Sequence, residues 1–385
     1  MAGKRKRLAQ RRKMCGYTQE GFAEALCVDR STVQRWERGE ADPQPHQRPK
    51  MARLLGVEPE GLELILAPDI AVAPEPALSR EERGEDLAFA IREMSRHLVA
   101  LDNAMNGVPI AEVAARSFKK VHRRLGEAAY DRRSERDVQA AAAELAEVAG
   151  WALFDAEEQS AARRFNQEAL FLARLSGDRS IELLIMQNIA MQAGHVGRPR
   201  EEVAIARAVI EQGGLSPRTE AIFRVREARG LSASARETEA ARYFARARSL
   251  IQDSGREDDP AWAWWFTSEE IDGHQGCALR RSGQAGKGIP FLQRAVRQEE
   301  GAQAGYRYIS GVQLLACYVE VEAWGDAEEL ARALIPVVGE MSSARALGFL
   351  NRTTCRGKAL SRAPSGLRDA LEHIESTIGE DPYGI

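Results

Sequence analysis

The chain has 385 residues, a length that suggests two or three folding units rather than one small domain. A hydrophobic content of 44% with only 6% aromatic residues, together with abundant alanine, favours a helix-rich soluble protein over a β fold. The five cysteines are scattered without CxxC spacing, which argues against both a disulfide framework and a zinc site. No segment reaches membrane-spanning length, so we expect a cytoplasmic protein without membrane contact.

The net charge of -3 is unevenly distributed along the chain. Residues 1–56 contain thirteen lysines and arginines against six acidic residues, a surplus of +7 that leaves -10 elsewhere. Binding to a phosphate backbone needs such a compact positive region, because each neutralised phosphate releases condensed counterions. The basic cluster of Lys4, Arg5, Lys6 and Arg7 is either an arm that contacts the DNA backbone or groove, or a disordered tail.

Residues 18–39 have the spacing of two short helices crossed at a tight turn. Thr18 can cap the first helix, and Phe22, Ala23 and Leu26 recur at the spacing of one buried helical face. A small residue is needed where two helices cross closely, and Ala23 occupies that position. This stretch therefore predicts a helix-turn-helix.

The second helix of this motif is predicted from Arg30 to about Arg38, with Asp29 as its cap and Gly39 at its end. Its inward positions are apolar, and its outward face carries Arg30, Ser31, Gln34 and Arg35. An arginine side chain fits guanine O6 and N7 in the major groove, and a glutamine can pair with adenine. The outward face is therefore either a base-reading surface or an ordinary solvated face, and we favour the first.

Residues 1–66 resemble the Cro/C1-type helix-turn-helix domain of bacterial and phage repressors, the XRE family. The resemblance rests on Thr18, Gln19, Ala23, Val28, Ser31, Thr32, Val33, Glu37 and Gly39. It implies that Arg30, Ser31 and Arg35, with Gln34 as a further candidate, contact bases of double-stranded DNA. It also implies that Gln19 sets the first helix on a phosphate, and that Arg12 and Glu37 form a structural pair.

Two residues depart from the family pattern. Cys27 occupies a turn position where glycine and a positive φ are expected, which costs a residue with a side chain roughly 1 kcal/mol. Gly21 replaces the usual glutamate, so the capping box with Thr18 is missing. Both changes weaken the local helices without moving the outward face.

The chain after residue 66 is predicted to be a linker over residues 67–79 and a helical repeat region over residues 80–385. Five segments of this region end in a small residue, at intervals of 39, 39, 48 and 38: Ala169, Ala208, Ala247, Ala295 and Ala333. These intervals are close to the length of a two-helix solenoid unit. Because one such unit cannot bury its apolar stripe alone, we expect the units to stack into a superhelix with a concave face.

The repeat region resembles tetratricopeptide repeats, and the whole chain is similar to bacterial regulators that join a Cro/C1-type domain to such repeats, including peptide-sensing quorum regulators. The resemblance implies an all-α fold, with a five-helix reader followed by a tetratricopeptide-like solenoid. It implies a homodimeric transcription regulator that binds operator DNA and takes a peptide, small-molecule or protein effector. The alternative is a DNA-tethered interaction scaffold without a small effector.

Three residues of the repeat region are candidates for effector contacts. Trp264 lies in the most aromatic stretch, residues 260–277, which is either a ligand platform or filling between repeats. The second reading is favoured, because adjacent residues of an α-helix cannot all face one groove. Asn188 and Asn351 lie within apolar helical runs, where each either holds a peptide backbone or is a satisfied buried amide.

The remaining motifs predict no chemistry. Glu270 and His274 lie four residues apart on a helix and could begin a metal site, but without further ligands a surface pair is favoured. The stretch at residues 283–288, GQAGKG, lacks the spacing of a phosphate-binding loop and predicts a turn. No catalytic triad, HExxH motif or nucleotide fingerprint is present. We therefore expect no enzymatic activity, no metal and no cofactor.

Overall fold

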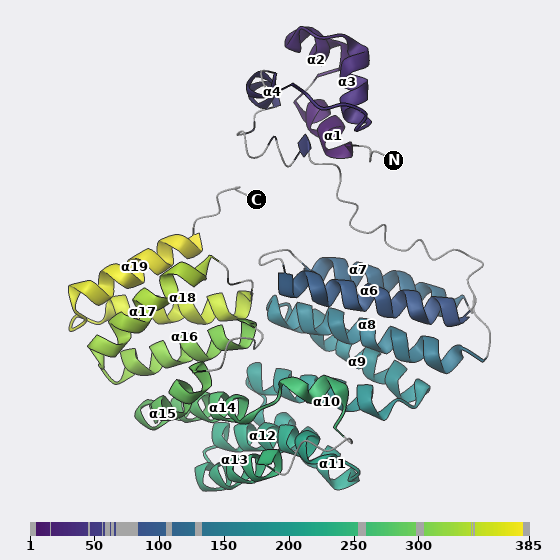
Figure 1. Ribbon diagram of the computed structural model, residues 1–385. Coiled ribbons are helices and arrows are strands. Elements are labelled where there is room, and N and C mark those ends of the chain that lie inside the picture. The colour runs from purple at the N-terminus through teal and green to yellow at the C-terminus, as the bar shows by residue number, and fades with distance from the viewer. Residues whose placement is uncertain are drawn as a thin grey trace. The chain divides into compact units, whose positions relative to one another are not determined.

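A computed structural model of the chain describes residues 5–15, 17–44, 47–55, 57, 62, 65–66, 84–104, 110–127, 133–252, 259–297, 304–339, 341 and 343–379. These residues form α-helices, one 3-10 helix and no strand, which confirms the predicted all-α class. The chain divides into two compact units, Met1–Ala77 and Leu78–Ile385 (Figure 1). The predicted linker at residues 67–79 lies outside the described residues. Within them, no helix has the length and apolar character needed to cross a membrane.

The first unit packs four described helices around one small core: α1 (Lys6–Met14), α2 (Gln19–Leu26), α3 (Arg30–Glu37) and α4 (Arg48–Leu55). Phe22 and Trp36 are among its largest fully buried side chains. Ala23 is buried in the same core, which includes α2 and α3, the two helices whose crossing the sequence predicted. Leu62, Ile65 and Leu66 are helical and pack on this core, at the position of the predicted fifth helix.

The caps of the motif differ in part from the prediction. Thr18 Oγ1 accepts a hydrogen bond from the Gly21 N–H at 3.0 Å, so the first cap forms without a capping box. Asp29 occupies the cap position of α3, but its side chain makes no capping hydrogen bond. Cys27 has a φ of 58°, the left-handed conformation that its place in the turn predicted.

The second unit is an array of helix pairs preceded by α6 (Gly84–Ala104) and α7 (Ile110–Gly126), which pack on α8. The six pairs are α8 (Glu135–Asp155) with α9 (Gln159–Ser176), α10 (Arg179–His195) with α11 (Pro199–Gln212), α12 (Pro217–Ala233) with α13 (Glu237–Gln252), α14 (Ser268–Arg281) with α15 (Ala285–Val296), α16 (Ala304–Glu320) with α17 (Trp324–Val338), and α18 (Ala344–Ala359) with α19 (Ser365–Gly379). The 3-10 helix η1 (Ala261–Trp265) precedes α14.

A left-handed residue in the turn marks the repeat more regularly than any side chain does. In five pairs the N–H of this residue bonds to the carbonyl three residues back, and the next N–H bonds to the carbonyl five residues before it. Only two of the five are glycines, and the other three carry a Cβ in a conformation that disfavours one. The five residues are Glu157, Gly197, Ala235, Gly283 and Glu322, with φ between 58° and 79°.

The alignment of the repeats by their small residues was wrong in two pairs. Ala169, Ala247 and Ala295 are buried, as a close helix contact requires. In α11 and α17, however, the predicted residue is exposed, and the alanine two positions earlier is buried. Both helices contain Ala-x-Ala, so the sequence offered two registers and the pattern could not choose between them. The exposed residues are Ala208 and Ala333, and the buried ones are Ala206 and Ala331.

The array curves until its last pair contacts its first described pair. Asp155, at the end of α8, accepts hydrogen bonds from Ser343 Oγ at 2.8 Å and from Arg345 Nη2 at 3.0 Å, at the start of α18. The Arg345 guanidinium carbon also lies 4.5 Å from the centre of the Phe154 ring. Helices α8 and α18 therefore meet although about 190 residues separate them in sequence.

Candidate functional site

A chain of buried polar contacts fixes the second helix of the helix-turn-helix. Arg12 Nε donates to Glu37 Oε1 at 2.7 Å, and the two side chains are only 5% and 9% exposed. The second oxygen of Glu37 accepts a hydrogen bond from Gln19 Nε2 at 2.6 Å, and Gln34 Nε2 donates to Gln19 Oε1 at 3.2 Å. The three helices α1, α2 and α3 are thereby tied together through Glu37. The Gln19 side chain is used to support α3. The phosphate contact predicted for Gln19 would therefore have to come from the backbone at the start of α2.

The outward face of α3 presents the residues that the sequence singled out. Ser31 and Arg35 are exposed, and Gln34 is half-buried through its bond to Gln19. Arg30 is 56% exposed, and its Nη1 lies 2.7 Å from Glu20 Oε1. An exposed ion pair of this kind contributes only about 0–1 kcal/mol, so it does not prevent Arg30 from turning to another acceptor.

The basic amino-terminal cluster is not a free arm at Arg5, which corrects the prediction for this residue. Arg5 is 6% exposed, and its Nη1 donates to the carbonyl of Ala41 at 2.8 Å. Its Nη2 pairs with Asp42. The charge of Arg5 is thus used to hold the loop after α3, a contact across 36 residues that no local pattern reveals. Lys4 lies outside the described residues, and of Lys6 and Arg7 only the helical backbone is described.

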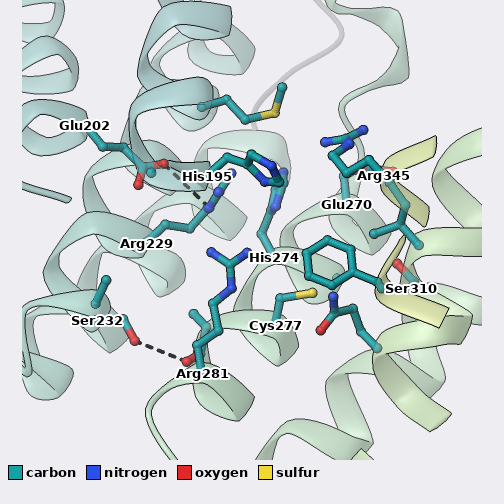
Figure 2. A pocket seen from close by; sticks show the side chains of 18 of the residues that line it. His195, Glu202, Arg229, Ser232, Glu270, His274, Cys277, Arg281, Ser310 and Arg345 are labelled. Carbon is teal, nitrogen blue, oxygen red and sulfur yellow. Dashed lines mark hydrogen bonds and ion pairs between the residues drawn. The ribbon is translucent and has the colours of Figure 1, made fainter. Parts of the chain in front are cut away.

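The inner surface of the helix-pair array contains a cavity of about 100 Å³. The first helices of the six pairs all contribute to its lining, and Glu202 reaches it from α11. Figure 2 shows these side chains converging on the cavity from different helices. Polar and charged residues predominate among them: His195, Glu202, Arg229, Ser232, Glu270, His274, Cys277, Arg281, Ser310, Gln313 and Arg345. We call this space the central cavity.

The carboxylates of the central cavity are poorly solvated. Glu202 is 2% exposed, and burial raises its pKa although Arg229 opposes the shift. Its Oε1 lies 3.5 Å from Arg229 Nε, an ion pair, while the carboxylate occupies the notch left by Gly194. A Cβ at Gly194 would stand 2.0 Å from Glu202 Oε2, so a larger residue here would displace the carboxylate from its present position. Burial raises the pKa of Glu270 to about 7.

Burial and nearby arginines lower the pKa of the histidine that lines the central cavity. Burial lowers the pKa of His274 well below its ordinary value, and the charges of Arg226, Arg229, Arg345 and Arg281 lower it further. Arg226 Nη1 lies 3.2 Å from His274 Nε2. His274 is therefore neutral at physiological pH. Glu270 and His274 line a cavity rather than forming the expected surface pair, and no metal-binding group of three side chains exists within the described ranges.

A second cavity, of about 230 Å³, brings together two of the three residues predicted to contact an effector. Asn188 and Trp264 both line it, whereas Asn351 is exposed on α18 and lines neither cavity. Trp262 and Trp265 join Trp264 there. Residues 261–265 form a short 3-10 helix after Pro260, so the α-helical period assumed for this stretch does not apply there. The favoured reading, filling between repeats, agrees with the packing of Trp262 and Trp265 against the cores of neighbouring helix pairs. We call this space the tryptophan cavity.

The tryptophan cavity is acidic. Asn188 is 4% exposed, and its Nδ2 donates to Glu147 Oε1 at 2.7 Å. Its Oδ1 accepts from Gln187, so the amide is satisfied within the protein. Burial raises the pKa of Glu147 to about 7, and burial together with the charge of Asp155 raises the pKa of Asp102. The two cavities thus differ in the charged side chains that line them, since arginines predominate in one and carboxyl groups in the other.

Sequence reasoning missed the charged residues of the central cavity. Arg229, Glu202 and Arg345 lie on three different helices, and they come together only when the array curves. One signal was available, namely that α12 carries Arg226 and Arg229 among small and apolar residues, on a helix whose apolar residues are mostly buried. A charged side chain within such a run needs a partner or a polar cavity.

Comparison with known protein families supports the first unit. Residues 8–62 match the sequence model of the Helix-turn-helix family, a segment that covers α1 to α4 and the core around Trp36. No curated protein matches the chain. The match, the exposed face of α3 and the buried pair behind it agree with one another. Residues 8–62 therefore form a Cro/C1-type helix-turn-helix domain, the DNA-binding domain of a family of transcription regulators.

Proposed function

We propose that the protein is a sequence-specific transcription regulator in which the helix-pair array binds an effector and controls the DNA-binding domain. The observation that carries this proposal is the exposed polar face of α3 on a domain that matches a DNA-binding family. Arg30, Ser31 and Arg35 would read base edges in the major groove, with Gln34 as a further contact.

The buried polar network gives this reading face its precision. A recognition helix must hold its side chains within a fraction of an ångström of the base edges, which requires a rigid support. Glu37 supplies it by binding Arg12 and Gln19 at 2.7 Å and 2.6 Å, respectively. The positive charge of residues 1–56 supplies the part of the affinity that does not depend on sequence.

The array would act as the sensor. Both cavities contain groups that a soluble scaffold does not need: arginines in one and tryptophans beside a carboxyl in the other. We propose a homodimer, because half-sites lie about one DNA turn apart and a small change in reader spacing then alters affinity. The effector would be a peptide, a small molecule or a protein. The alternative function is a DNA-tethered scaffold that binds a protein partner only.

Sequencing the DNA fragments that the purified full-length protein retains from a random pool tests the proposal. We expect enrichment of one motif, and Arg35→Ala should relax the preference at one position, at a cost of about 1–3 kcal/mol. Lys6→Ala should instead weaken all sequences alike and flatten the salt dependence. A pool without enrichment would exclude specific reading. A stoichiometric protein partner recovered from extracts, with no effect of small extract components, would favour the scaffold.

A further inference from the structure

We propose that the central cavity binds an anionic group, a carboxylate or a phosphate, between the guanidinium groups of Arg229 and Arg281. This inference rests on the proposed function, because it assigns one chemical feature to the effector of the array. The two arginines come from neighbouring inner helices, α12 and α14, and Figure 2 shows both side chains in the cavity. Two converging guanidinium forks are the arrangement that recognises a planar carboxylate or a phosphate.

Arg281 is the first element of this site. Its side chain is exposed to the cavity, and within the described part of the chain it makes no hydrogen bond and no ion pair. Burial among the surrounding helices and the nearby charge of Arg229 both lower its pKa. The guanidinium is therefore solvated rather than paired, and an anion that enters the cavity can bind it without displacing a protein acceptor.

Arg229 is the second element, and it is only partly neutralised. Its ion pair to Glu202 runs through Nε at 3.5 Å, a long contact. The two terminal nitrogens of Arg229 have no acceptor in the described structure, so its outer edge is available to a ligand. Glu202 holds the guanidinium in place, and Gly194 gives the carboxylate room to do so. Glu202 is in this sense a positioning residue for the site.

The charge balance of the cavity selects an anion over a cation. Arg345 is neutralised by Asp155, and Arg226 Nη2 donates to Gln187 Oε1 at 2.8 Å. The carboxylates that line the cavity are Glu202 and Glu270, and burial raises the pKa of both, which disfavours their charged forms. Burial is the main reason that the pKa of His274 is low, and the charges of Arg226, Arg229, Arg345 and Arg281 lower it further. A ligand cation would be repelled by the same arginines.

The test is a titration of the full-length protein, labelled with ¹³C at histidine, with inorganic phosphate and separately with acetate at constant ionic strength. His274→Gln identifies the reporter signal. We expect a saturable shift of the His274 resonance and a rise in its pKa, because a bound anion cancels part of the arginine field. Arg281→Gln should weaken binding at least tenfold without lowering the melting temperature. Arg246→Gln, an exposed arginine on α13, is the matched control and should change nothing.

The outcomes separate cleanly. Tighter binding of phosphate indicates a phosphorylated effector, and tighter binding of acetate indicates a carboxylate such as a peptide terminus; both support the site. Absence of a saturable shift with either anion, or unchanged affinity in Arg281→Gln, overturns it. Retention of the selected DNA motif is measured on the same samples. If neither anion binds but the protein still selects a DNA motif, only this inference is refuted. If the wild-type protein selects no DNA motif, the proposed function is refuted.

Discussion

Removing the carboxylate of Glu37 should strongly destabilise the DNA-binding domain and leave the stability of the helix-pair array unchanged. In Glu37→Ala, the nearly buried guanidinium of Arg12 loses the one charged partner that it has among the described residues, and it keeps the carbonyl of Tyr17 as an acceptor. Breaking a buried ion pair from one side costs about 3–5 kcal/mol. A domain of this size has a total stability of only about 3–9 kcal/mol. The substitution therefore consumes a large part of that stability, and Gln19 loses its support at the same time.

Hydrogen exchange followed by mass spectrometry on the full chain measures this effect by region. We expect amides of α1 to α3 to lose protection equivalent to about 3 kcal/mol or more, while amides of α8 to α19 do not change. Arg12→Met together with Glu37→Ala should recover much of the loss, because no buried charge is then left alone. Glu40→Ala, which breaks only an exposed pair to Arg38, is the control. Protection in α1 to α3 that falls by less than about 1 kcal/mol would refute the structural role of the pair.

Two further substitutions test the backbone and the pH response of the array. Ala235→Gly should raise the free energy of unfolding by about 0.5–1 kcal/mol, because glycine adopts a positive φ without strain. Gly283→Ala, where a Cβ meets no neighbour, should lower it by about 1 kcal/mol. Urea unfolding measures both changes, and the same sign for both would contradict the strain assigned to these turns. Burial raises the pKa of Glu147 from about 4.5 to about 7, so its contribution to stability is complete below about pH 4.5 and is lost as the pH rises through about 7. The free energy of unfolding of Glu147→Gln should therefore fall less between about pH 5 and pH 8 than that of the wild-type protein. The difference between the two falls should be at most about 3 kcal/mol. The exposed control Glu211→Gln should behave as the wild-type protein does.

The parts of the molecule that could be predicted are those that local spacing determines. The inward and outward faces of α3 follow from a 3.6-residue period within eight residues, so its apolar inward positions, Val33 and Trp36, lie in the core as predicted. The left-handed conformation of Cys27 followed from the family pattern, which expects a positive φ at this turn position. Arg5 was misplaced because its partners, Ala41 and Asp42, lie 36 and 37 residues away.

The cavities depend on contacts over still longer distances. Nothing in the local pattern of α12 indicates that Arg229 will face α14 and α18, because that outcome depends on the curvature accumulated over several pairs. The tryptophan cavity likewise depends on segments that are far apart in sequence. Asn188 and Trp264 were both candidates for effector contacts, but they line one cavity only because η1 packs beside α6, α8 and α10. The fold class and the outward face of α3 are thus encoded locally, and the two cavities are encoded by the whole array.

The contact of Asp155 with Ser343 and Arg345 changes how the array can respond to a force. An open stack of repeats relaxes at its free end, so a disturbance in the middle fades before it reaches the other end. Because its first and last described pairs are in contact, this array is closed and does not have two free ends. A displacement at one pair can therefore pass to the other pairs in both directions, including across the contact between α8 and α18. Arg345 both binds Asp155 and lines the central cavity, so a ligand in that cavity would also act on the contact between α8 and α18.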